Sequence, residues 1–265
     1  MYMGLVPGTS QQQTECTNGQ IQQRDLSTCK CSGGNDQCTT TCSAGPDAPN
    51  CPNDVLSQYN LDHCSLHCGA ESGHHCKACW IWFDPLCNCL QSGGCQQSSN
   101  NAPFWVKVNS EIITTSSPIP DILDLQTNHP SLAPFGWDFG QQSGVSDTSK
   151  DALVINSVHS ITEDQIHMHV CPVNTGIKNF LGSLTPSQYY DLKDIQITGY
   201  TIYCRASHSA GQPVSGDVVA ADINTVMGKE CKYYVGAAVL RDKNDLAWSC
   251  VTADHLSTEY KRFCD

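Results

Sequence analysis

The sequence predicts an α+β domain over residues 98–265, preceded by a disulfide-rich, mostly irregular region over residues 1–97. Two observations lead to this division. Strand-like apolar runs recur through the second part, separated by turn residues and by few helix signals. The first part holds 13 of the 18 cysteines and is otherwise rich in Gly, Ser and Gln, so we expect disulfides to replace the apolar core that it lacks.

Two segments of the first part have a recognisable pattern. Residues 54–67 are compatible with a short helix, and Trp80, Trp82 and Phe83 form an apolar cluster. We interpret this cluster as the small core of the region rather than as a ligand- or lipid-binding surface, because little other apolar material is available there. Residues 96–103, QQSSNNAP, are typical of a linker.

The second part is dominated by strand-like runs. We expect strands at residues 104–113, 152–157, 165–171, 195–204, 231–240 and 246–252. Helices are expected at residues 121–125, at 185–191, where Thr185 is a candidate N-cap followed by Pro186, and at 254–263. Residues 129–150 contain Pro, Gly and Ser throughout, which predicts a loop. We find no internal sequence repeat.

The charge balance excludes some classes of partner. The formal net charge is −12 and the pI is about 5.1, which argues against nucleic acid or an anionic membrane as the main partner. It does not weigh against a small nucleotide, which needs only a local pocket. No apolar run is long enough to span a membrane. A small-molecule partner is thus compatible with this composition, and the oligomeric state stays open.

The cysteines predict an oxidising compartment, and hence a secreted protein. Thirteen of the 18 precede residue 96 and five follow it, so both counts are odd. If every cysteine is paired, at least one disulfide joins the two parts. The first ten residues lack the charged and apolar segments of a secretory signal, and we interpret them as a mature N-terminus whose leader has been removed.

The most informative stretch is residues 165–170, in which polar and apolar side chains alternate. Alternation places side chains two residues apart on one face of a strand. Gln165, His167 and His169 are therefore expected in one row, while Ile166, Met168 and Val170 face a core. A neutral imidazole can attack phosphorus if its other ring nitrogen is held by an acceptor that fixes the tautomer.

This row resembles the histidine triad superfamily, whose motif is His-φ-His-φ-His-φ-φ with the middle histidine as nucleophile. Gln165 stands at the first position here. The longer run ALVINSVHSITEDQIHMHVC is similar to the Ala-x-x-Ile-Asn-Ser…Gln-Asp-Gln-Leu-His-Ile-His-Ile-Ser-Cys core of the CDP-diacylglycerol pyrophosphatase family. The firm match covers residues 152–171, with weaker similarity at 113–125 and 184–190. The resemblance implies a HIT-like antiparallel sheet with flanking helices.

The resemblance also implies roles for individual residues. His167 would be the nucleophile and His169 its phosphate-contacting partner. The residues expected to bind substrate or phosphate are Asn156, His159, Ser160, Thr162 and Gln165, of which His159 is placed by sequence proximity alone. The implied reaction is attack on a nucleotide diphosphate ester, a nucleotidyl-histidine intermediate and hydrolysis to a nucleoside monophosphate. The resemblance implies no metal and no cofactor.

Other interpretations of the same residues stay open. The histidines could act as acid–base catalysts on a non-nucleotide substrate, or the protein could be a non-catalytic secreted binding module in which the cysteine-rich region does the work. His-x-His with Cys171 could also bind zinc or copper. Cys76 and Cys79 have zinc-knuckle spacing, which we interpret as part of the disulfide framework. Three acidic residues that could hold a ribose or a cation are interpreted as solvated loop carboxylates: Asp121, Asp124 and Asp138.

Overall fold

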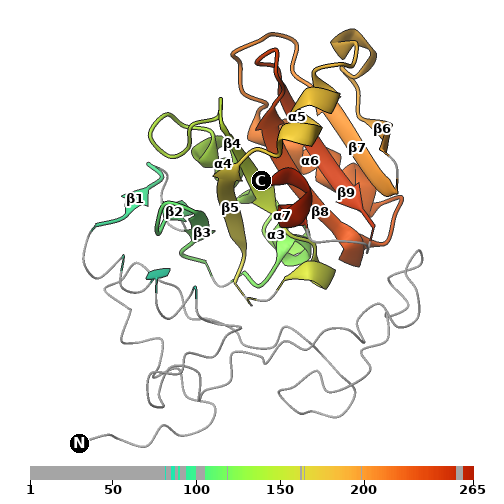
Figure 1. Ribbon diagram of the computed structural model, residues 1–265. Coiled ribbons are helices and arrows are strands. Elements are labelled where there is room, and N and C mark those ends of the chain that lie inside the picture. The colour runs from blue at the N-terminus through green and yellow to red at the C-terminus, as the bar shows by residue number, and fades with distance from the viewer. Residues whose placement is uncertain are drawn as a thin grey trace, which may run out of the picture.

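The computed structural model describes residues 105–117, 119–161, 165–197, 199–254 and 259–265, with residues 81, 85–86, 89, 94–99 and 163. This part of the chain forms one antiparallel sheet in the order β1-β2-β3-β5-β4-β8-β9-β7-β6 (Figure 1). The strands are β1 Gln96–Gln97, β2 Trp105–Lys107, β3 Ile112–Thr115, β4 Asp151–Ile155, β5 His167–Pro172, β6 Lys193–Ile197, β7 Tyr200–Ala206, β8 Val235–Arg241 and β9 Ala247–Ala253. The predicted α+β class is confirmed.

Helices cover both faces of the sheet, so the domain has three layers (Figure 1). One face is covered by α3 Ile122–Asn128, α4 Ala133–Gly140 and α6 Gly216–Met227. The other face is covered by α5 Thr175–Leu181 and α7 Glu259–Phe263. Short 3₁₀ turns lie at η3 Val158–Ser160, η4 Pro186–Gln188 and η5 Lys232–Tyr234.

Strand alternation divides the apolar residues between two cores. Met168 of β5 is buried in the core under α3, α4 and α6. Phe263 of α7 and Trp248 of β9 are buried in the core on the opposite face. In the first core the backbone of Gly136 packs directly against the ring of Trp105. A Cβ atom at Gly136 would lie 2.4 Å from that ring.

The sheet consists of two halves with the same connectivity. In the first half two strands, two helices, two strands and α5 follow one another, and the strands lie in the order β2-β3-β5-β4. In the second half two strands, one helix, two strands and α7 follow, and the strands lie in the order β6-β7-β9-β8. β4 pairs with β8 in antiparallel fashion and joins the halves. The structure thus contains a repeat that the sequence does not show.

Several element predictions were wrong in detail. The runs at 104–113 and 195–204 each form a hairpin rather than one strand, β2–β3 and β6–β7. The predicted loop at 129–150 contains helix α4, which has Pro134 in its first turn. Helices α5 and α6 were not predicted. At 185–191 the structure has only the turn η4, and Thr185 makes no side-chain cap there.

Part of the predicted linker forms a strand, and most of the elements predicted before it lie outside the described residues. Gln96–Gln97, expected to begin a linker, forms the edge strand β1, which pairs with β2. The expected helix at 54–67, the aromatic cluster at residues 80–83 and the Cys76–Cys79 spacing lie outside the described residues, apart from Ile81, which is buried. Across the described ranges, no helix is long and apolar enough to cross a membrane.

Disulfides staple the described part of the chain at three places. Cys171 pairs with Cys264, Cys204 with Cys250, and Cys89 with Cys95. Cys231 is also disulfide-bonded, and its partner lies outside the described residues. The other four cysteines after residue 96 pair with one another. Cys231 is therefore bonded to a cysteine that precedes residue 96, as the odd cysteine count requires.

Candidate active site

The polar row of β5 lies on the sheet face that α7 covers. His167 pairs in register with Thr114 of β3, and His169 pairs with Val154 of β4. His167 is buried and His169 is half-buried. The alternate side chains Ile166, Met168 and Val170 are buried in the opposite core, as the alternation predicted.

Gln165 is a buried anchor just before β5. Its Nε2 atom donates to the backbone oxygens of Thr115 and Ser117, at 3.1 and 3.0 Å, and lies 3.3 Å from the hydroxyl of Thr114. These contacts tie the start of β5 to the end of β3. The side chain predicted to contact phosphate thus has its amide nitrogen engaged with protein oxygens.

The tautomer of His167 is fixed by the backbone carbonyl of Gln165. Nδ1 of His167 lies 2.8 Å from the carbonyl oxygen of Gln165. Because a carbonyl can only accept, Nδ1 carries the proton in this bond. In the neutral ring the lone pair is therefore on Nε2, which is the arrangement that a nucleophilic histidine needs.

Asn156, which follows β4, joins His169 to helix α7. Its Oδ1 atom accepts from the backbone N–H of Tyr260 at 3.0 Å, and this bond orients the amide. Nδ2 therefore points the other way, 3.4 Å from Nε2 of His169. Accepting at Nε2 places the proton of neutral His169 on Nδ1. The rings of His167 and His169 meet edge to face, with centroids 4.8 Å apart.

Both histidines stay uncharged at neutral pH. Burial lowers the pKa of His167 below its usual value of 6.5, although the bond to Gln165 partly opposes this effect. Burial, together with the neighbouring His167, lowers the pKa of His169 to about 3. The pair therefore presents two neutral imidazoles rather than a cationic site.

Helix α7 is fixed against the histidine face by a fully buried carboxylate. Glu259 accepts from the backbone N–H of Ser157 and from the hydroxyl of Thr252, both at 2.9 Å. Burial raises the pKa of this carboxyl, and the two hydrogen bonds oppose the rise. Gly236 makes room for it, since a Cβ atom there would lie 2.5 Å from the Glu259 side chain.

The remaining predicted site residues are less closely tied to the histidines. The Ser160 hydroxyl lies 2.9 Å from that of Ser157, within the turn η3. His159 packs edge-on against Tyr234, with centroids 5.0 Å apart, and has no described contact with His167 or His169. Thr162 lies outside the described residues. The structure thus brings together Asn156, Gln165, His167 and His169.

The acidic candidates have structural partners. Asp121 caps α3 by accepting from the backbone N–H of Asp124. Asp124 in turn accepts from Asn128 and pairs with His129. Asp138 accepts from the backbone N–H of Gly216, joining α4 to the start of α6.

The hypothesised metal site of His167, His169 and Cys171 lacks a free thiolate. Cys171 is bonded to Cys264, so its sulfur is not a thiolate. In the described ranges, no group of three or more His, Cys, Asp or Glu side chains is arranged to hold a metal ion.

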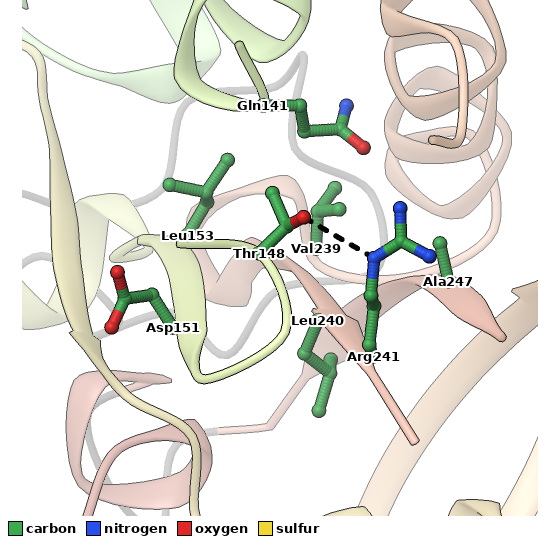
Figure 2. A pocket seen from close by; sticks show the side chains of 8 residues that line it. All are labelled: Gln141, Thr148, Asp151, Leu153, Val239, Leu240, Arg241 and Ala247. Atoms are coloured by element: carbon green, nitrogen blue, oxygen red, sulfur yellow. Dashed lines mark hydrogen bonds between the residues drawn. The ribbon is translucent and has the colours of Figure 1, made fainter. Parts of the chain in front are cut away.

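A separate cavity lies at the opposite end of β4 and β8, and Figure 2 shows its lining. Its volume is about 10 Å³, which leaves room for about one water molecule. Arg241 dominates the polar part, but its guanidinium already donates to Thr148, to Gly211 and to Asp245. We therefore regard the cavity as part of the loop packing rather than as a ligand site.

Comparison with known proteins leaves the family open, since no family model and no curated protein matches the chain. The site therefore has to be judged on its own geometry.

Sequence reasoning missed Thr114, Glu259 and Tyr260. Thr114 donates to the backbone oxygen of Ile166 at 2.6 Å and so helps to hold the start of β5. A helix was expected at 254–263, but no local pattern indicates that it reaches a strand about 100 residues earlier. The burial of Glu259 is visible only in the structure.

Proposed function

We propose that this protein is a secreted hydrolase that cleaves phosphoanhydrides in nucleotide-linked substrates through a covalent intermediate on His167. The observation that carries the proposal is the bond from His167 Nδ1 to the Gln165 carbonyl, which leaves the lone pair of the neutral imidazole on Nε2. The resemblance of residues 152–171 to the CDP-diacylglycerol pyrophosphatase family supports the same chemistry.

The proposed reaction has two displacement steps. Nε2 of His167 attacks the phosphorus that carries the nucleoside, an N–P bond forms, and the anhydride P–O bond breaks. The second phosphate leaves as a phosphate monoester with the bonding electron pair. Water then attacks the same phosphorus, loses one proton to the solvent, and the N–P bond breaks with its electron pair returning to Nε2. This gives a nucleoside monophosphate and the neutral imidazole.

The other residues have supporting roles in this proposal. The Nδ1–H of His169 donates to a phosphate oxygen, because Nε2 already accepts from Asn156. Asn156 therefore acts by orienting His169 and not by binding the phosphate itself. Gln165 acts as a positioning residue through its carbonyl and its buried amide.

The histidine pKa values favour nucleophilic catalysis over acid–base catalysis. A general acid or base works best when its pKa lies near the working pH. A pKa of about 3 makes His169 a poor proton donor and a poor proton acceptor near neutral pH. A nucleophile must be unprotonated, and the lowered pKa of His167 keeps it so near neutral pH while making the attacking nitrogen less basic. We therefore place acid–base catalysis on a non-nucleotide substrate second to nucleophilic catalysis.

Product analysis tests the proposal. The full chain is incubated with CDP-linked and ADP-linked esters, and the products are separated by ion-exchange chromatography. The expected products are CMP or AMP and the matching phosphate monoester, lost in His167→Ala and kept in His208→Ala, which changes an exposed histidine that packs on Tyr190. Products without a nucleoside monophosphate, or activity that survives His167→Ala, would rule out the proposed reaction.

A further inference from the structure

Helix α7 brings an exposed aromatic ring to the histidine pair. The ring centroid of Tyr260 lies 4.8 Å from that of His169, with an angle of 61° between the planes. Tyr260 is 40% exposed, and its backbone N–H is held by Asn156. The backbone is thus fixed at the site while much of the side chain faces solvent.

The exposed ring is not what docks the helix. Glu259 and Phe263 are fully buried, and Cys264 is bonded to Cys171. These three residues supply the packing, the buried hydrogen bonds and the covalent link that α7 needs. A large aromatic side chain left exposed beside two neutral imidazoles is therefore available for a ligand.

The ring also comes from the other half of the sheet. The histidines belong to the first repeat, on β5, whereas α7 follows β9 of the second repeat (Figure 1). α7 nevertheless packs on β4 as well as on β8. The site therefore combines a reactive pair from one repeat with an aromatic side chain from the other.

We infer that Tyr260 binds the nucleobase of the substrate by stacking, while the adjoining phosphate lies at His167 and His169. The inference rests on the function proposed above and names the part of the substrate that the histidines do not hold. In a nucleotide only the ribose separates base from phosphate, and Tyr260 is the next ring after His169. Aromatic side chains stack on any base, so we expect weak discrimination between bases.

Steady-state kinetics on the full chain test this inference. A CDP-linked ester is compared with dimethyl diphosphate, which has the anhydride but no base. For Tyr260→Leu we expect KM for the CDP-linked ester to rise about tenfold with kcat little changed, because a base stack is lost. Kinetics on dimethyl diphosphate should be unaffected, and Tyr260→Phe should behave as wild type.

The control is Phe135→Leu, which removes another exposed aromatic ring on the opposite face of the sheet, in α4. It should leave both substrates unaffected. Equal losses on both substrates in Tyr260→Leu would mean that Tyr260 only supports His169, and unchanged KM values would mean that it makes no contact. Either result overturns the inference.

A binding experiment separates this inference from the hydrolase proposal. If the wild type turns over neither substrate, the hydrolase proposal fails, and calorimetric titration with CMP decides the stacking inference by itself. CMP binding that weakens about tenfold in Tyr260→Leu, with inorganic phosphate binding unchanged, supports stacking. Absence of CMP binding to the wild type, or equal affinity in Tyr260→Leu, overturns it.

Discussion

The carbonyl oxygen of Gln165 lies 2.8 Å from Nδ1 of His167, so the first residue of the polar row fixes the tautomer of the second through its main chain. Because the acceptor is a main-chain carbonyl, this contact does not depend on which side chain stands at position 165. The Gln165 side chain is instead used for the buried bonds to the backbone after β3. In the proposed reaction the two histidines carry the chemistry, and Gln165 supports them.

The lowered histidine pKa values predict an unusual pH dependence of activity. Because both imidazoles stay neutral below their ordinary pKa of 6.5, kcat/KM should not fall as the pH drops through 6.5. The decline should begin only at more acidic pH. An acid limb centred near pH 6.5 in a pH–rate profile would show that the reactive histidine titrates normally and would contradict the burial argument.

The same shifts predict how stability changes with pH. His169 binds fewer protons when folded than when unfolded, between its folded pKa of about 3 and its usual 6.5. Its contribution to stability is therefore present above pH 6.5 and is lost as the pH falls towards 3. Urea unfolding between pH 7 and pH 4 should show this loss, and His169→Gln should reduce the slope. An unchanged slope in the variant would contradict the prediction.

The disulfide between Cys171 and Cys264 should matter for activity as well as for stability. It joins the strand of the histidines to the end of α7. Replacing both cysteines by serine should cost about 2–5 kcal/mol of stability and lower activity about tenfold or more, because α7 loses its covalent anchor beside His169. Unfolding experiments and product assays on the same samples measure both effects.

The matched control is the pair Cys204 and Cys250, which joins β7 to β9 away from the histidines. Replacing both by serine should cost similar stability but leave the activity of the folded fraction close to wild type. Equal loss of activity in both double variants would show that α7 docking has no special role.

Gly236 should tolerate no side chain, because the carboxylate of Glu259 lies over it. A Cβ atom would come within 2.5 Å of Cγ and Cδ of Glu259, which is itself held by two hydrogen bonds. Gly236→Ala should therefore destabilise the protein by about 1–3 kcal/mol and reduce activity through α7. Gly228→Ala is the control, since its nearest neighbours lie at 3.5 Å. Thermal unfolding that ranks the two variants equally would contradict this account.

Two buried glutamines should respond to substitution in opposite ways. Gln126 of α3 is buried, and neither of its amide atoms has a hydrogen-bond partner in the described part of the chain. Gln126→Met should therefore raise the free energy of unfolding by about 1–3 kcal/mol, since it removes an unsatisfied buried amide. Gln165→Met should lower it, because three oxygen contacts are lost. Denaturant unfolding that gives the same sign for both would contradict the hydrogen-bond argument.

The polar row could be predicted because strand alternation is a local signal. His167, His169 and their buried neighbours needed only a period of two residues. Helix α4 was missed because Pro134, Gly136 and Gly140 have the composition of a loop. Yet Pro134 suits a first helical turn, and the two glycines allow close contact with Trp105 and with Leu153.

The rest of the site depends on contacts between distant residues. Tyr260 meets Asn156 across 104 residues, and Glu259 meets Ser157 across 102. No period or cap in residues 254–263 specifies those partners. The two halves of the sheet likewise share connectivity rather than a recognisable sequence pattern, so the repeat became visible only from the strand order.

The covalent intermediate on His167 is the most direct test of the central claim. The full chain is mixed with a CDP-linked ester, quenched in alkali within one turnover, digested and analysed by mass spectrometry. We predict a cytidylyl group on the peptide that contains His167 in the wild type, and none in His167→Ala. A rapid turnover to CMP with no adduct at any quench time, or an adduct on His169 instead, would contradict the account.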